Sequence, residues 1–182
     1  NNYYSGYANG VEKSFDEVGN LKLAEEYVFG TEYGKSTRYF VNKSKIFEYN
    51  RVNGDAEGEF KYFNSKGDAI LILGYEYNDL KYYIKLNAAG ELKDRVPVVD
   101  ETASIVSKYP NGKTAMAINF VKGVKDGNYL INNPEGKPEV QLTYKMNKLE
   151  GERKEYYSNG NVYKIERFKN NDFEGTQEYY KE

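Results

Sequence analysis

Residues 151–175 read GERKEYYSNGNVYKIERFKNNDFEG and contain one complete unit of a repeat. Two strand-like runs, Glu152–Tyr157 and Val162–Lys169, are separated by the turn Ser158–Asn161 and followed by a second turn, Asn170–Asp172. An Asn-Gly pair between two such runs is typical of a β-hairpin, because both central residues of the turn adopt positive φ. The stretch therefore predicts a hairpin with two strands of about five to seven residues.

The same unit recurs along the whole chain. Most units start on a glycine, at a spacing of 24 residues, and Lys81 and Ala103 complete the series with spacings of 23 and 22: Gly10, Gly34, Gly58, Gly127, Gly151 and Gly175. A period of this length indicates a stack of small similar units. We predict an all-β fold, an elongated open single-sheet meander of about eight stacked hairpin repeats, forming one domain over residues 1–182.

The composition agrees with a thin sheet and limits the partners. Of 182 residues 39% are hydrophobic, and 20 are Tyr, whose apolar ring and polar hydroxyl suit a half-buried surface. The 26 basic and 28 acidic residues are interspersed and leave a net charge of -2, without the basic stripe that nucleic acid requires. The longest apolar run, Ala69–Leu73, is far too short to span a membrane.

Three residue types are missing from the sequence: Cys, His and Trp. Disulfides, thiolate or His-ligated metal sites, and Ser-His-Asp or Cys-His nucleophiles are thereby excluded. We predict a protein that is not an enzyme, with no catalytic residues, no cofactor and no metal.

Two segments depart from the regular repeat. Residues 93–102 fit the spacing poorly, and Pro97 within them has no N–H to give to a sheet, which predicts an edge, a bulge or a bend. The run Ala69–Leu73 lacks alternation, which is typical of a strand covered on both faces.

The sequence resembles a known repeat family. Residues 156–161 (YYSNGN) and 168–175 (FKNNDFEG) are similar to the bacterial variant of the MORN repeat, a group often labelled antitoxin-like. The resemblance is strongest over residues 10–67 and 103–182. It implies an open meander of hairpins and a role in partner binding or scaffolding. The eukaryotic unit carries His and Trp, so the phospholipid binding of some eukaryotic members is not implied for this chain.

Adjacent aromatic pairs are the candidate interaction surface. One member of each pair falls on a single column of the repeat: Tyr39, Phe63, Tyr156 and Tyr180. Neighbouring residues of a strand point to opposite faces, so the other members are expected on the second face: Phe40, Tyr62, Tyr157 and Tyr179. These aromatics either cover both faces of the sheet or form an exposed stripe that anchors a protein or a sugar ring.

Charged and turn residues have simpler interpretations. A run of mixed charge predicts a solvated face with cross-strand ion pairs, and nothing singles out a glycosidase-like carboxylate pair: Glu152, Arg153, Lys154, Glu155, Lys164, Glu166 and Arg167. Polar turn residues lack the acidic spacing of calcium loops, and turn chemistry explains them: Asn53, Asp55, Asp126, Asn170, Asn171 and Asp172.

We therefore expect a non-catalytic repeat protein that presents an extended β-surface to another protein. The alternatives are a carbohydrate- or cell-wall-binding module and an antitoxin that neutralises a toxin. The edge Gly175–Tyr180 could also pair with a second copy. Residue 1 is Asn, and Tyr3 lies 24 residues before Tyr27, so we expect a preceding segment, either a signal peptide or further repeats, and slightly favour export.

Overall fold

The computed structural model describes residues 3–182, and in this range it contains strands and no helix. The prediction of an all-β meander of hairpins is confirmed. The expectation for the start of the chain, which rests on Asn1, lies outside the described residues. The chain packs as two compact units, the first ending at Tyr83 and the second beginning at Ile84.

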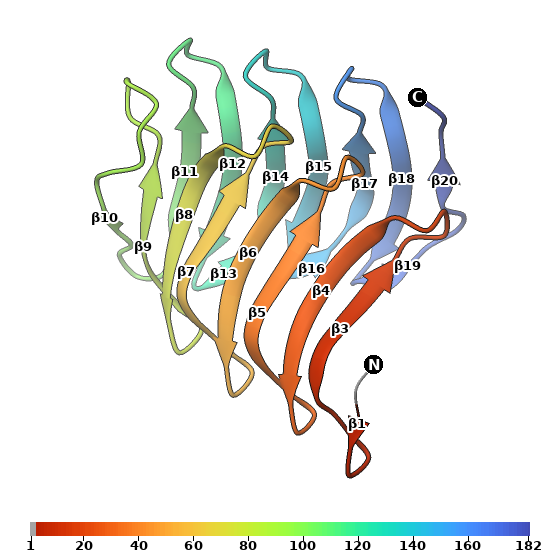
Figure 1. Cartoon of the computed structure of the whole chain (residues 1–182). Coiled ribbons are helices and arrows are strands. Elements are labelled where there is room, and N and C mark those ends of the chain that lie inside the picture. Colours follow the sequence, from red (N-terminus) through yellow and green to blue (C-terminus); the bar gives the residue numbers. More distant parts are fainter. Residues whose placement is uncertain (1–2) are drawn as a thin grey trace. The chain divides into compact units, whose positions relative to one another are not determined.

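Nine strands belong to or begin in the first unit: β1 (Tyr3–Tyr4), β2 (Tyr7–Ala8), β3 (Gly10–Phe15), β4 (Leu21–Val28), β5 (Thr31–Tyr39), β6 (Lys45–Val52), β7 (Asp55–Phe63), β8 (Ala69–Glu76) and β9 (Asp79–Lys85). Strand β1 pairs with β2, and the order β9-β8-β7-β6-β5-β4-β3 follows the chain (Figure 1). Consecutive strands pair antiparallel from β3 to β8, as hairpins require.

The second unit continues the meander in shorter pieces: β10 (Val96–Pro97), β11 (Ala103–Lys108), β12 (Thr114–Val121), β13 (Val124–Lys125), β14 (Gly127–Asn132), β15 (Pro138–Lys145), β16 (Lys148–Leu149), β17 (Gly151–Tyr156), β18 (Val162–Lys169), β19 (Asp172–Phe173) and β20 (Glu178–Tyr179). Strands β11 to β20 form a ten-stranded sheet, in which the short β13, β16 and β20 pair with β12, β15 and β18.

The single continuous sheet that we expected is not observed. The strands are divided among the two-stranded sheet of β1 and β2, an eight-stranded sheet that ends at the short strand β10, and the ten-stranded sheet that begins at β11. The interruption falls in the irregular segment 93–102, where only single bridges flank β10. Pro97 lies in this edge strand, as predicted, because it lacks the N–H that a further ladder would use.

The first turn of each unit spans five residues, and six of these seven turns follow a β-bulge. In the 151–175 unit, Tyr157 N–H donates to Asn161 O at 2.8 Å and Gly160 N–H donates to Tyr157 O at 2.9 Å. Only Gly160 has positive φ (93°), so the Asn159-Gly160 pair is not the two-residue turn that its sequence suggested. The same two bonds recur in the turns that start at residues 16, 40, 64, 87, 109 and 133. Lys43 (φ 70°) stands where the other six turns have glycine.

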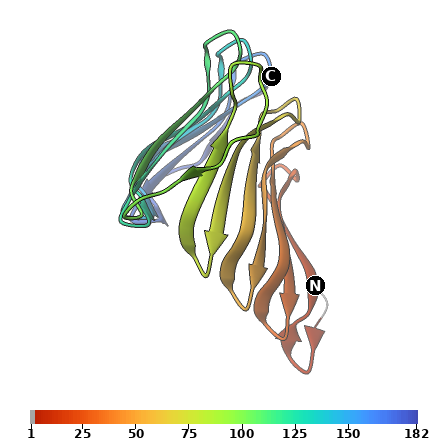
Figure 2. The same cartoon turned by 90° about the vertical axis from the view of Figure 1, so that its left-hand side faces the viewer.

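The two-residue turns with both φ values positive lie at the other ends of the strands. Asn170 (φ 53°) and Asn171 (φ 76°) form the clearest one. The series comprises residues 5–6, 29–30, 53–54, 77–78, 100–101, 122–123, 146–147 and 170–171. In the eight-stranded sheet the turns at 29–30, 53–54 and 77–78 gather at one end (Figure 2). The positive-φ pairs predicted for the hairpins are therefore found in this second series.

Six of the eight two-residue turns, those at 29–30, 53–54, 77–78, 122–123, 146–147 and 170–171, are hydrogen-bonded to the repeat before them. Asn171 N–H donates to Leu149 O at 3.1 Å, and its side-chain Oδ1 accepts from Leu149 N–H at 2.6 Å. Asn170 N–H donates to the Glu150 carboxylate at 3.1 Å. The same three bonds join Tyr77-Asn78 to Glu57 and Ala56, and Met146-Asn147 to Asp126 and Lys125. These contacts explain why Asp or Glu precedes the first glycine of those units.

Apolar side chains fill the core of each unit. In the first unit the adjacent residues Ile70 and Leu71 are both fully buried, so β8 is covered on both faces, as its missing alternation predicted. In the second unit the large buried side chains alternate along β12, with Met116, Ile118 and Phe120 on one face of the sheet.

Candidate functional site

The first set of predicted aromatics occupies an equivalent position in three hairpins. Tyr39, Phe63 and Tyr156 are the last residues of β5, β7 and β17, each directly after the β-bulge. All three are half-buried, and Tyr180, which follows β20, is exposed. These residues stay accessible in part, but three of them terminate strands rather than form the centre of a sheet face.

The second set of predicted aromatics, Phe40, Tyr62, Tyr157 and Tyr179, mostly packs against other side chains of the protein. Phe40 and Tyr62 are only 3% and 2% exposed, so neither forms part of an exposed stripe. The rings of Tyr157 and Tyr179 both pack against Tyr163, at centroid distances of 5.1 and 5.8 Å. The aromatic pairs thus fall into a buried group and a half-buried group, and they lie in two different units of the chain.

The run of mixed charge is not one solvated face. Four of its side chains are buried on one face of the second unit: Arg153, Glu155, Lys164 and Glu166. Lys164 Nζ lies 3.0 Å from Glu166 Oε2 and 3.8 Å from Glu155 Oε1, and Arg153 pairs with both carboxylates. Strand alternation puts Glu152, Lys154 and Arg167 on the opposite face, where they form the expected exposed ion pairs.

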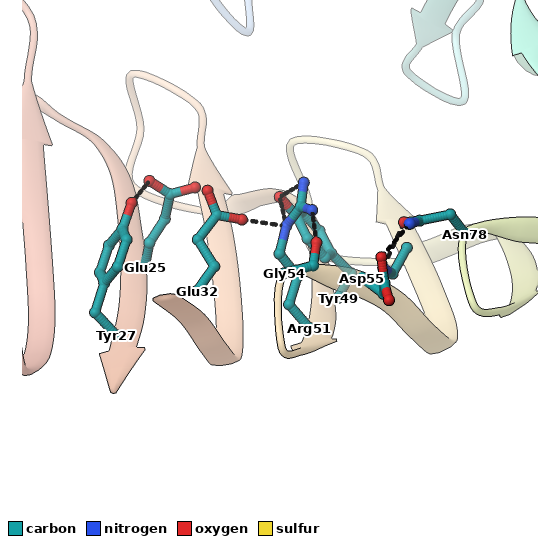
Figure 3. A network of polar contacts seen from close by, with 9 residues as sticks. Glu25, Tyr27, Glu32, Tyr49, Arg51, Gly54, Asp55 and Asn78 are labelled. Carbon is teal, nitrogen blue, oxygen red and sulfur yellow. Dashed lines mark hydrogen bonds and ion pairs between the residues drawn. The ribbon is translucent and has the colours of Figure 1, made fainter. Parts of the chain in front are cut away.

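A second polar group lies on the first unit, close to the two-residue turns (Figure 3). Tyr27 and Glu25 come from β4, and the Tyr27 hydroxyl donates to Glu25 Oε2 at 3.4 Å. Glu32 of β5 forms an ion pair with Arg51 of β6, whose guanidinium lies over the Tyr49 ring at 5.2 Å. Side chains from three neighbouring strands therefore form one row across the sheet.

This row has more negative than positive charge. Burial raises the pKa of the Glu25 carboxyl, and the Glu32 and Glu12 carboxylates raise it further, while the Tyr27 hydrogen bond and Arg51 lower it. Burial and the same three carboxylates raise the pKa of the Tyr27 hydroxyl to about 12. Both shifts have the sign expected where a single arginine faces several carboxylates.

One group of exposed side chains was not predicted from the sequence. The first residue of the two-residue turn is Asn at positions 53 and 170, but it is Phe29, Tyr77 and Met146 in three other turns. Their φ values are 48–49°, a region that bulky residues rarely adopt, and the side chains are 61%, 80% and 70% exposed. The signal was present in the sequence, because all five positions fall 19 residues after a unit's first glycine.

Within residues 3–182 no group of three or more Cys, His, Asp or Glu side chains is arranged to hold a metal ion. No helix in the described part of the chain is long and apolar enough to cross a membrane.

Comparison with known proteins identifies one repeat. The MORN repeat variant matches residues 149–170, which cover Leu149, β17, the five-residue turn and β18 up to the two-residue turn. No curated protein matches the chain. MORN repeats form a family that is in general not enzymatic. The match supports the resemblance to MORN repeats, and this chain contains a MORN-type hairpin at residues 149–170.

Proposed function

We propose that this chain is a non-catalytic repeat protein that presents an extended β-surface to a partner protein, as a binding or scaffolding element. The proposal rests on the distribution of the exposed apolar side chains. Most of the large ones lie in a two-residue turn or within two residues of one: Tyr4, Tyr7, Val28, Phe29, Val52, Tyr77, Val99, Val121, Met146 and Phe173.

The five-residue turns differ from this pattern. Among their described residues only Val18 is a large exposed apolar side chain, and most of the others are Asn, Asp, Ser, Lys, Glu or Gly. Exposed apolar groups concentrated at one kind of turn favour contact with another protein. A hydrogen-bonded sheet also holds such groups in fixed positions, so that little conformational freedom is lost on binding.

The test combines capture with reconstitution. Tagged protein is used to capture partners from the source organism's lysate, and each candidate is purified and titrated by calorimetry. We expect a stoichiometric complex with one purified protein. Turnover on a panel of hydrolase substrates that disappears when one carboxylate is changed would refute the proposal. The toxin-neutralising alternative is a special case, and it predicts that the purified partner is a toxin.

A second candidate function, glycan binding, rests on a shallow hollow of about 310 Å³ in the second unit. Amide, hydroxyl and charged side chains line it: Asn128, Gln141, Thr143, Glu152 and Lys154. The Tyr156 hydroxyl donates to Gln141 Oε1 at 2.6 Å and fixes one of these amides. Such groups suit sugar hydroxyls. A glycan array without binding at millimolar glycan would exclude this function.

A further inference from the structure

Two exposed aromatic residues in the first unit adopt a backbone conformation that is unfavourable for aromatic side chains. Phe29 and Tyr77 have φ values of 49° and 48°, where bulky L-residues are strained. Asn53, in the turn between them, shows that the same backbone accepts a residue that prefers this region. Strain combined with an exposed apolar side chain does not help folding, and it points to contact with another molecule.

These residues belong to a larger surface, which we call the apolar edge: Tyr4, Tyr7, Val28, Phe29, Val52 and Tyr77. The Tyr4 and Phe29 rings are in contact, with centroids 6.0 Å apart, and Tyr7 packs directly over Gly30. Successive two-residue turns are separated by two strands, about 10 Å, so Phe29 and Tyr77 lie about 20 Å apart. An extended peptide of about six residues spans that distance.

The charge around the apolar edge is strongly acidic. Residues 24–33, 50–58 and 74–81 contain seven carboxylates and two cations, a net charge of 2 − 7 = −5: Glu25, Glu26, Glu32, Asp55, Glu57, Glu76 and Asp79 against Arg51 and Lys81. The opposite end of the same strands, residues 13–23, 36–48 and 59–70, contains five carboxylates and seven cations, a net charge of 7 − 5 = +2. Complementary charge therefore selects a cationic ligand at the apolar edge and disfavours an anionic one.

We propose that the apolar edge of the first unit binds a cationic segment of the partner protein, in which Lys or Arg residues are interspersed with large apolar residues. The apolar side chains contact Phe29, Val52 and Tyr77, and the cations pair with the surrounding carboxylates. This inference rests on the proposed function and adds the chemistry of the partner. An anionic membrane surface is the competing ligand, and the net charge of −5 opposes it.

The test uses a labelled ten-residue peptide that alternates Arg and Leu, followed by fluorescence anisotropy. Two control peptides replace Arg by Glu or Leu by Ser. The variant protein carries Phe29→Asn and Tyr77→Asn, which place the residue found at positions 53 and 170 in the same backbone. The matched control is Met146→Asn, the same exchange in a turn of the second unit that lies outside the apolar edge.

We expect the Arg-Leu peptide to bind more tightly than both control peptides. The double variant should weaken binding about tenfold or more, and Met146→Asn should change it less than about twofold. Asn relieves the strained φ, and this offsets the loss of the Tyr4–Phe29 ring contact, so both variants should melt within a few degrees of the native temperature and weaker binding will not reflect unfolding.

Four results would overturn the inference. They are no binding of the Arg-Leu peptide, equal binding of either control peptide, undiminished binding to the double variant, and binding of native protein to anionic phosphatidylserine vesicles that the double variant loses. The proposed function is judged separately, with the purified protein partner. If that partner still binds the double variant at full strength, the inference fails and the function stands; if no protein partner is reconstituted, the function fails.

Discussion

The side chain of Asn171 provides the clearest test of how the repeats are joined. Replacing it by Gly keeps the positive φ of 76° and the bond from residue 171 N–H to Leu149 O, and removes only the 2.6 Å bond from Leu149 N–H to the side-chain Oδ1. Asn171→Asp keeps an acceptor at the same place and is the matched control. The reverse exchange is Gly54→Asn, in a turn where Gly54 N–H already donates to Glu32 O at 2.9 Å.

The expected magnitude follows from three contributions. Losing the hydrogen bond costs about 0.5–1.5 kcal/mol, and glycine adds about 0.4–1 kcal/mol of unfolded-state entropy. Relief of the positive φ at Asn offsets up to about 1 kcal/mol of this, because Asn tolerates that region better than most residues. Asn171→Gly should therefore lower the free energy of unfolding by about 1 kcal/mol. Gly54→Asn should raise it by a similar amount, since only Thr31 Cγ2, at 4.0 Å, lies near the new Cβ.

Urea unfolding measures the change in free energy, and a thermal scan should show a shift of about 2–4 °C for a chain of this size. Hydrogen exchange provides the local readout, because the Leu149 amide should exchange faster in Asn171→Gly and not in Asn171→Asp. The reasoning fails if Asn171→Gly is as stable as the native protein and its Leu149 amide stays equally protected.

Three further predictions concern single side chains. Lys43→Gly should raise the free energy of unfolding by about 0.5–1 kcal/mol in urea, because φ is 70° there; a loss would contradict this. Lys164→Met should cost about 3–5 kcal/mol by leaving the two buried carboxylates of Glu155 and Glu166 to share Arg153, whereas Lys154→Met on the exposed face should cost less than about 1; equal losses would contradict the buried network. Glu25→Gln should stabilise the protein at pH 7 but not at pH 3, as measured in paired melts. Folding raises the pKa of the Glu25 carboxyl, so the carboxyl's contribution to stability is fully present below its ordinary pKa and is lost as the pH rises through the raised pKa. The neutral Gln does not undergo this loss.

The unit, its period and the position of its turns could be predicted from the sequence because each repeats the same local chemistry. The type of turn could not be read from one Asn-Gly pair. Gly160 is required by a single positive φ in a five-residue turn, whereas Asn170 and Asn171 adopt the paired positive φ values. Asn and Gly are common to both kinds of turn, so only the pairing of the strands distinguishes them.

Burial was the harder part of the site to predict. Strand alternation correctly separates Glu152 and Lys154 from Arg153 and Glu155, but it does not say which face is covered. Both faces of β17 carry charged residues, so no hydrophobic pattern indicated which face would be buried. Phe40 is a similar case, because it follows β5 as the first residue of a turn and is nevertheless buried. Tertiary packing determines these outcomes, and it is not encoded in a single unit.

A repeat protein makes functional residues visible in a way that a single globular core does not. Every unit imposes the same backbone demand at an equivalent position, so the other units serve as internal references. The first residue of the two-residue turn must adopt positive φ, and Asn53 and Asn170 do so with little strain. Phe29, Tyr77 and Met146 adopt the same positive φ with more strain, and their side chains are exposed. Folding alone does not account for that choice, and of the three only Phe29 and Tyr77 also have an acidic surrounding. The departure from the repeat, rather than the repeat itself, therefore indicates where a partner should bind.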